Sequence, residues 1–193
     1  MSAELTNTGG RRPPLQSHLG LRPAAFGPNT FPMIRPATTA DAAAIAAIYN
    51  HYVANTIITF EEEPVGVAEM SGRMAEVAAA KLPWLVWAGD EKVLGYAYAG
   101  KWKSRCAYRY TVEATVYLDQ AATGRALGTR LYTALIAGLK QSGYHGVIGG
   151  VALPNAASVA LHEKLGFQKV AHFKETGFKF KQWIDVGYWE LIL

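Results

Sequence analysis

Thr123-Gly124-Arg125-Ala126-Leu127-Gly128 follows a β-rich run, Tyr110 to Leu118, and precedes a helix-forming segment. The small residues at 124, 126 and 128 let the backbone approach a bulky anion. In the first turn of a helix the N–H groups have no intrahelical acceptors, and the helix dipole is positive there. The stretch therefore predicts a loop-to-helix junction that holds phosphate through its main chain, although a plain turn is the commoner role of such a stretch.

The pattern around this junction predicts one α/β domain. Leu127, Leu131, Leu135 and Leu139 recur at i, i+4 spacing, which predicts a helix that buries this face against a sheet and ends at Gly143. Further helices are expected over 42–52, 66–80 and 155–165, strands over 34–35, 85–88, 93–101, 109–118, 146–151, 167–173 and 184–192, and hairpin turns at 89–92 and 178–181.

Composition narrows the class of protein. The chain has 193 residues, a formal charge of +4 and one cysteine, Cys106. This length suits a single buried core, and a lone cysteine excludes an internal disulfide framework and fits the reducing cytoplasm. No apolar run is long enough to span a membrane. The modest charge, without clustered basic residues, argues against nucleic-acid binding.

Residues 1–32 differ from the remainder. They hold five of the nine prolines and lack apolar periodicity, so we expect a disordered N-terminal extension before a domain over 33–193. Pro13, Pro14 and Pro23 interrupt any apolar core that a secretory signal would need. One hypothesis is that Met33 is the true start of the protein.

Several motifs occur in a fixed order along residues 33–193. They are Tyr49-Asn50-His51-Tyr52, Trp102-Lys103-Ser104-Arg105, Thr111-Val112-Glu113, the segment Asn155 to Phe167, and Lys181-Gln182-Trp183-Ile184-Asp185. With the 123–128 stretch, they resemble the GNAT superfamily of N-acetyltransferases, and within it the phosphinothricin and methionine sulfoximine acetyltransferase branch. This resemblance implies a GNAT fold, with a mixed, mostly antiparallel central sheet flanked by helices, and acetyl-CoA as co-substrate without a metal.

The resemblance also implies where acetyl-CoA binds. Backbone N–H groups of Val116, Tyr117 and Leu118 are expected to pair with the pantetheine arm and polarise the thioester. The phosphates are expected at Thr123, Gly124, Arg125, Ala126, Leu127, Gly128 and Thr129. Thr123 stands where the family has Gln or Arg, and Ala126 replaces an inner glycine, yet neither change removes an N–H group. Arg125 and Arg130 either flank the phosphates or lie on a solvated helix surface.

Amine acetylation requires a base for the ammonium proton, and Glu113 is our candidate. It is flanked by β-branched residues in a predicted strand, an environment that raises a carboxylate pKa. A glutamate in a strand is more often solvent-facing, but the resembled branch places its catalytic carboxylate here.

Asn155, Ser158 and His162 lie at i, i+3 and i+7, so that one helix face presents all three toward the cofactor. Asn155 either hydrogen-bonds the pantetheine amide or caps the helix. His162 is either the acid that protonates the departing thiolate or a wall of the tunnel, because the branch carries histidine where much of the superfamily has tyrosine.

For the acceptor, an arginine fork with nearby tyrosines suits a carboxylate or phosphinate. The expected contacts are Phe60, Trp102, Lys103, Arg105, Tyr108, Thr111, Thr115 and Trp183, with Tyr110 and Tyr188 close by. Lys103 and Arg105 could equally be ordinary charged residues on the surface. Aromatic residues in such strands more often pack in the hydrophobic core. The resemblance implies that the hairpin bearing Trp183 completes the pocket of a partner subunit, which predicts a homodimer.

We therefore expect a cytoplasmic acyltransferase that moves acetyl from acetyl-CoA to the α-amino group of a small amino acid or its phosphinic or sulfoximine analogue, by direct attack in a ternary complex. The alternatives are a protein or peptide N-terminal acetyltransferase and a non-catalytic acetyl-CoA sensor. A pure binder would need neither Glu113 nor His162.

Overall fold

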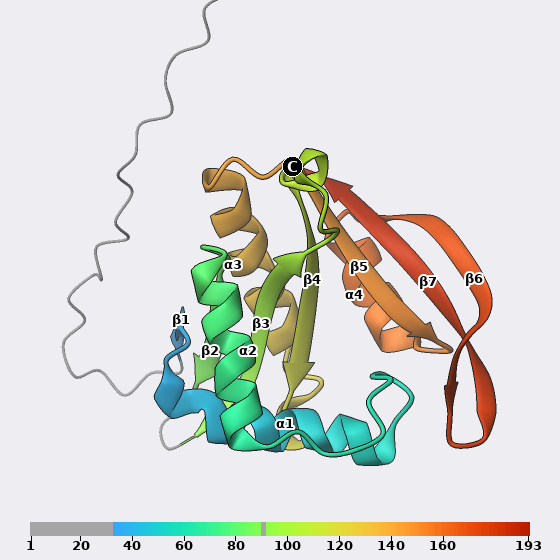
Figure 1. The fold of residues 1–193 in the computed structure, drawn as a ribbon, viewed down its shortest axis with the longest axis horizontal. Helices are drawn as coiled ribbons and strands as arrows, with labels where there is room; N and C mark the ends of the chain where they lie inside the picture. Colours follow the sequence, from blue (N-terminus) through green and yellow to red (C-terminus); the bar gives the residue numbers. More distant parts are fainter. Residues whose placement is uncertain (1–32, 90–91) are drawn as a thin grey trace, which may run out of the picture.

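The computed structural model describes residues 33–89 and 92–193. Its centre is a seven-stranded sheet in the order β1-β2-β3-β4-β5-β7-β6 (Figure 1). The strands are β1 (Met33–Pro36), β2 (Trp84–Ala88), β3 (Val93–Lys101), β4 (Thr111–Leu118), β5 (Gly146–Leu153), β6 (Gln168–Lys179) and β7 (Gln182–Ile192). The helices are α1 (Ala42–Asn55), α2 (Val67–Ala79), α3 (Leu127–Gln141) and α4 (Ala156–Lys164). Among the strands that the structure describes, only β4 and β5 pair in parallel, which confirms the mixed, mostly antiparallel sheet.

Helices cover both faces of the sheet, and each face has its own core (Figure 1). Successive side chains of a strand point to opposite faces, so β3 directs Tyr96 into the core beneath α1 and α2 and Ala97 into the core beneath α3. The predicted leucine face of α3 is confirmed, because its four leucines are buried against the sheet. Among the described residues, no helix has the length and apolar character that a membrane crossing requires.

Some predicted boundaries are wrong. β4 begins at Thr111 rather than 109, because residues 106–108 form a 3₁₀ turn in which Arg109 N–H donates to the Cys106 carbonyl. β6 and β7 are longer than predicted, since Phe180 and Lys181, both at positive φ, form a two-residue hairpin turn between them. The hairpin predicted at 178–181 is thereby confirmed. Residues 1–32, 90 and 91 lie outside the described part of the chain, and so do the predictions that fall on them.

The parallel pair β4–β5 opens part of the way along its length. Thr111 to Glu113 pair with Gly146 to Ile148, and beyond this point β4 continues beside β3 while β5 continues beside β7. Parallel neighbours need a crossover connection, and α3 supplies it. The fold therefore places a V-shaped opening, here called the splay, between residues 114–118 and 149–153, next to Glu113.

Candidate functional site

A narrow cavity of about 50 Å³ occupies the splay. Its lining comes from both strands, from α4 and its N-cap, from α3 and from the loop after α1: Ile58, Ala114, Thr115, Val116, Tyr117, Tyr132, Gly150, Val151, Ala152, Asn155, Ser158 and His162. Six of the predicted site residues thus meet there. Strand backbone left unpaired by a neighbouring strand is free to bind an extended amide-containing chain, which is the chemistry of a pantetheine arm.

The predicted phosphate junction has the expected backbone form. Gly124 and Ala126 adopt left-handed conformations, with φ 75° and 59°, and α3 begins at Leu127. The first i→i−4 bond of α3 is donated by the Arg130 N–H to the Ala126 carbonyl. The N–H groups of Leu127, Gly128 and Thr129 precede that bond and are therefore available to an anion. The residues present fit a pyrophosphate.

Side chains around the junction separate into those that can reach an anion and those that are engaged elsewhere. The Thr123 hydroxyl donates to the Gln120 carbonyl at 2.9 Å, which stabilises the loop. Arg125 is exposed beside the free N–H groups, whereas the Arg130 guanidinium lies over the Trp87 ring, 5.7 Å from its centroid. The Leu118 carbonyl accepts from the Tyr52 hydroxyl at 2.7 Å, so this end of β4 is anchored to α1.

Glu113 is the last β4 residue paired with β5, and it stands at the vertex of the splay. Its side chain is half-buried, and burial raises its pKa, while the charge of Lys103 opposes that shift. A carboxylate with a raised pKa beside a cavity is suited to accept a proton from an ammonium group.

Two adjacent glycines in β5 give room to the two predicted catalytic side chains. A Cβ atom on Gly149 would lie 2.2 Å from His162 Nε2, and one on Gly150 would lie 3.2 Å from Glu113 Oε1. Because neighbouring residues of a strand face opposite sides of the sheet, Glu113 and His162 approach β5 from opposite faces. The sheet therefore separates the two groups at the splay.

His162 is 3% exposed and firmly held. Its Nδ1 lies 2.7 Å from the Ser158 carbonyl, which can only accept, so Nδ1 carries the hydrogen. Its Nε2 lies 3.3 Å from the Tyr132 hydroxyl, and that hydroxyl is also 2.7 Å from the Ala114 carbonyl. Burial lowers the pKa of His162, and the bond to Ser158 only partly offsets this. The neutral imidazole therefore presents an unprotonated Nε2.

Asn155 serves as the N-cap of α4, since its Oδ1 accepts from the Ser158 N–H at 3.1 Å. The capping role is thus confirmed, and it leaves the Asn155 amide group, which also lines the splay cavity, able to donate. Asn155, Ser158 and His162 line the same cavity, so the prediction that they share one side of the helix is confirmed.

The predicted acceptor residues divide into two groups. Lys103, Arg105, Tyr108 and Thr111 line a second cavity of about 280 Å³, together with Lys101 and Arg109. Glu113 does not line this cavity, but Lys103 connects the cavity with the surroundings of Glu113. Lys103 Nζ lies 4.4 Å from the centre of the Trp102 ring, and Trp102 packs edge-on against Tyr188. Tyr188 in turn lies beside Gly150 and Glu113.

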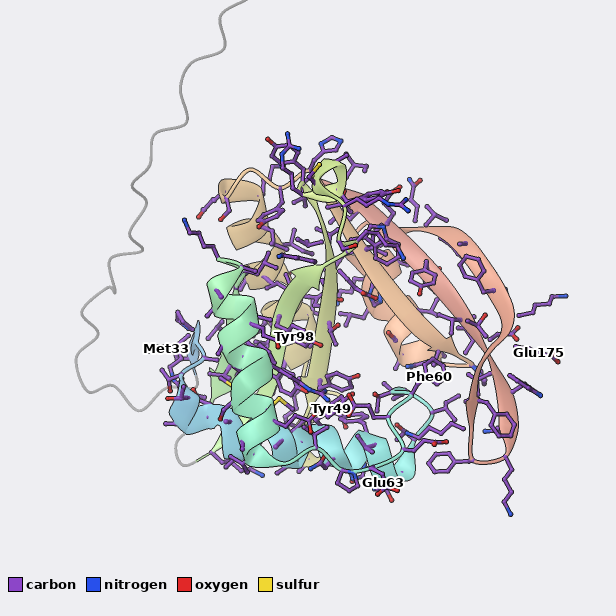
Figure 2. All side chains as sticks on the ribbon, in the orientation of Figure 1. Met33, Tyr49, Phe60, Glu63, Tyr98 and Glu175 are labelled. Carbon is purple, nitrogen blue, oxygen red and sulfur yellow. The ribbon has the colours of Figure 1, made fainter. Side chains whose placement is uncertain are left out.

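The remaining predicted contacts lie elsewhere. Thr115 lines the splay. Phe60 belongs to the loop between α1 and α2 and lies against the β6–β7 hairpin (Figure 2). Trp183 is 62% exposed near the hairpin tip and packs on Phe178, so in this chain it contacts neither cavity. Within residues 33–89 and 92–193, no three or more His, Cys, Asp or Glu side chains group as metal ligands do.

Sequence reasoning missed four residues that contribute to the site. Tyr132 follows Gly128 by one helical turn and belongs to the buried face of α3, a signal that the leucine periodicity concealed. Gly149 and Gly150 interrupt an otherwise apolar strand, which is a known sign of close approach by another group. Ile58 carries no such signal, because its place in the splay depends on the course of the loop.

Comparisons with known proteins agree with this geometry. The family described as "Acetyltransferase (GNAT) domain" matches residues 34–187. Phosphinothricin N-acetyltransferase of Streptomyces viridochromogenes is 41% identical over 157 residues, which cover 81% of this chain and 85% of that protein. L-methionine sulfoximine/L-methionine sulfone acetyltransferase of Salmonella typhimurium is 39% identical over 163 residues, covering 83% and 94%.

A solved structure is similarly close. It is a GNAT superfamily phosphinothricin acetyltransferase from Sinorhizobium meliloti in complex with AcCoA, with a TM-score of 0.82 and 34% identity, covering 84% of this chain and 88% of that one. The match of the family over most of the chain, the relatives above 30% identity and the splayed sheet lead to one conclusion: the chain belongs to the GNAT acetyltransferase family.

Proposed function

We propose that this protein transfers an acetyl group from acetyl-CoA to the α-amino group of phosphinothricin, methionine sulfoximine or a similar small amino acid. The observation that carries the proposal is Glu113, a half-buried carboxylate of raised pKa at the vertex of the splay. The relatives named above act on these acceptors, and they cover most of this chain.

The acceptor's anionic end is best accommodated by the cavity at the ends of β3 and β4. Lys101, Lys103, Arg105 and Arg109 line it with the Tyr108 and Thr111 side chains, and its lining contains no carboxylate. Guanidinium and ammonium groups bind carboxylates and phosphinates through charge-assisted hydrogen bonds. Lys103, which faces both this cavity and Glu113, would orient the amino group of the acceptor toward the base.

Acetyl-CoA, when bound, supplies a thioester carbonyl for the amine to attack. The junction N–H groups of Leu127, Gly128 and Thr129 would hold its phosphates, and Val116, Tyr117 and Asn155 would hold its pantetheine arm in the splay. We propose that both substrates are bound together, because the two cavities are separate and Glu113 stands on β4 between Val112, which lines the acceptor cavity, and Ala114, which lines the splay cavity.

The proton balance assigns different roles to the two predicted catalytic residues. The ammonium group loses two protons as the new C–N bond forms and the C–S bond breaks. Glu113 accepts one, and the departing sulfur takes the other. No proton from His162 is required, and its neutral imidazole has none at Nε2. We therefore propose that Glu113 is the base and that His162 shapes the wall of the tunnel.

We also propose a homodimer, in a reducing compartment such as the cytoplasm. Phe173, Phe178, Phe180 and Trp183 are each more than half exposed on one hairpin, an apolar surface that fits a second copy of the chain. The exposed free thiol of Cys106 supports the compartment. Light scattering of the wild type and of Trp183→Lys tests the dimer: a dimer that the substitution converts to monomer is expected, and a monomeric wild type would contradict it.

The function is tested by following thiol release from acetyl-CoA with phosphinothricin, methionine sulfoximine, methionine sulfone, the common amino acids and short peptides. Turnover on the amino-acid analogues, lost in Glu113→Gln, is the expected result. Turnover on peptides alone would contradict the proposed acceptor class, and acetyl-CoA binding without turnover on any amine would contradict the proposed activity.

A further inference from the structure

Near the tip of the β6–β7 hairpin, apolar side chains are exposed and a charged side chain is buried. Phe178 and Phe180 are 51% and 53% exposed, whereas Lys179 between them is 1% exposed. Burying an ammonium group is unfavourable unless it is hydrogen-bonded, and here Lys179 Nζ donates to the Thr59 carbonyl at 2.8 Å. A buried lysine tied to a residue 120 positions away therefore connects the hairpin with the loop between α1 and α2.

A second contact ties the same two segments. A Cβ atom on Gly177 would lie 2.1 Å from Phe60 Cε1, so the Phe60 ring occupies the space that the glycine leaves open. Gly177 and Lys179 are two residues apart on one strand and therefore share a face. That face of the hairpin receives the adjacent residues Phe60 and Thr59 from the loop.

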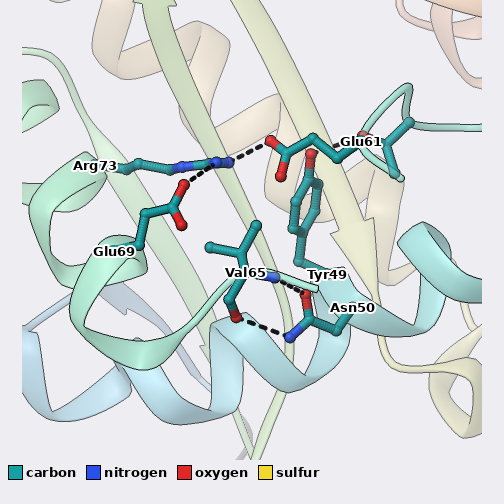
Figure 3. Close-up of polar contacts among 7 residues, drawn as sticks. Tyr49, Asn50, Glu61, Val65, Glu69 and Arg73 are labelled. Atoms are coloured by element: carbon teal, nitrogen blue, oxygen red, sulfur yellow. Dashed lines mark hydrogen bonds and ion pairs between the residues drawn. The ribbon is translucent and has the colours of Figure 1, made fainter. Parts of the chain in front are cut away.

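The helices hold the remainder of the loop (Figure 3). The Asn50 side chain exchanges two hydrogen bonds with the Val65 backbone, at 2.8 and 2.9 Å, and Arg73 pairs with Glu61 at 2.6 Å. The Tyr49 hydroxyl lies 2.6 Å from Thr59 Oγ1. Thr59 is thus bound through its side chain to α1 and through its carbonyl to Lys179.

The neighbours of Thr59 explain why its position matters. Ile58 lines the splay cavity, and Phe60 lies on its other side along the chain. A shift of the Thr59 carbonyl moves both side chains, one of which belongs to the cavity next to Glu113. Burial lowers the pKa of Lys179, and the charges of Glu62 and Glu61 on the same loop oppose this shift.

We propose that Lys179 is a positioning residue for acetyl transfer: through the Thr59 carbonyl it fixes the α1–α2 loop, whose Ile58 lines the splay cavity, and thereby sets the affinity for acetyl-CoA. This inference rests on the proposed function for its kinetic consequence. Lys179 touches neither substrate in this role, so its removal would weaken acetyl-CoA binding without removing the base.

The test compares Lys179→Met with Lys140→Met, which removes an exposed lysine near the end of α3. Lys179→Met is expected to raise the KM for acetyl-CoA about tenfold with kcat within threefold of wild type, since the loop and not Glu113 is displaced. Lys140→Met is expected to leave both unchanged. A fall in kcat at constant KM in Lys179→Met would overturn the proposal.

Amide hydrogen exchange supplies a readout that needs no acceptor. In Lys179→Met, residues 57–63 are expected to exchange at least tenfold faster while α3 is unchanged. Gly177→Ala, which displaces Phe60 instead, is expected to give the same pattern and serves if Lys179→Met does not fold. Unchanged exchange in 57–63 would overturn the proposal, whereas faster exchange in a protein that acetylates no acceptor would uphold the tie and contradict the proposed function.

Discussion

The two sides of the splay hold their ionisable groups in different ways. On one face, Glu113 is half-buried beside Lys103 and Tyr188, and its pKa is raised. On the other, His162 is buried, its Nδ1–H is bound to the Ser158 carbonyl, and its pKa is lowered. One group is poised to exchange a proton, and the other is fixed in its neutral form. Proximity to the reacting atoms therefore does not by itself make a residue an acid or a base.

Replacing Glu113 by glutamine removes the base and keeps the shape of the side chain. We expect kcat to fall by about 10²–10⁴-fold, the usual contribution of a general base. The Kd for acetyl-CoA, measured by calorimetry, should stay unchanged, because the junction and the splay backbone are intact. Equal losses in turnover and in acetyl-CoA affinity would assign Glu113 a binding role instead.

The same variant has a stability signature. The pKa of Glu113 is raised in the folded state, so the protonated side chain is favoured by folding. Its contribution to the free energy of unfolding is therefore fully present below the pKa of an unfolded glutamate and is lost as pH rises through the raised folded-state pKa. Near pH 7 the ionised side chain costs stability, and Glu113→Gln should unfold at the same or a higher temperature than wild type. A lower Tm at pH 7 would show that the Lys103 charge outweighs burial.

Substitutions at the two adjacent glycines of β5, Gly149 and Gly150, distinguish most clearly between the His162 face and the Glu113 face of the sheet. Gly149→Ala forces a methyl group into the His162 ring and should cost about 1–3 kcal/mol of unfolding free energy, as overpacking does. Gly150→Ala meets the carboxylate of Glu113 at 3.2 Å and the edge of the Tyr188 ring at 3.3 Å, so it should lower Tm less than Gly149→Ala does while lowering kcat. Denaturant unfolding and steady-state kinetics on both variants check the contrast, and a reversed pattern would exchange the roles assigned to the two sides.

Ala126, outside both sides, should give the smallest effect. Its left-handed backbone is unfavourable for alanine by about 1–2 kcal/mol, and glycine avoids this while costing about 0.5–1 kcal/mol in the unfolded chain. Ala126→Gly is therefore expected to stabilise the protein by up to about 1.5 kcal/mol, or no more than about 6 °C in Tm. Gly124→Ala, at another left-handed position, is the control and should destabilise.

Local sequence patterns were sufficient to predict much of the fold and part of the candidate site. The leucine face of α3, the glycine-rich junction and the Glu113 strand are periodic or short-range features, and each was recognisable. The inward direction of Lys179 was not, because it depends on Thr59, which is distant in sequence. The meeting of Tyr132 with His162 likewise depends on how α3 and α4 pack beside the splay.

The pH dependence of kcat for the wild type, Glu113→Gln and His162→Gln tests the central contrast most directly. For the wild type we expect a rise with pH through an apparent pKa above the ordinary glutamate value, because the base must be ionised. His162→Gln should keep this rise of kcat with pH, with a loss in kcat below about tenfold. Glu113→Gln should no longer show the rise. A rise of kcat with pH that persists in Glu113→Gln and disappears in His162→Gln would contradict the account.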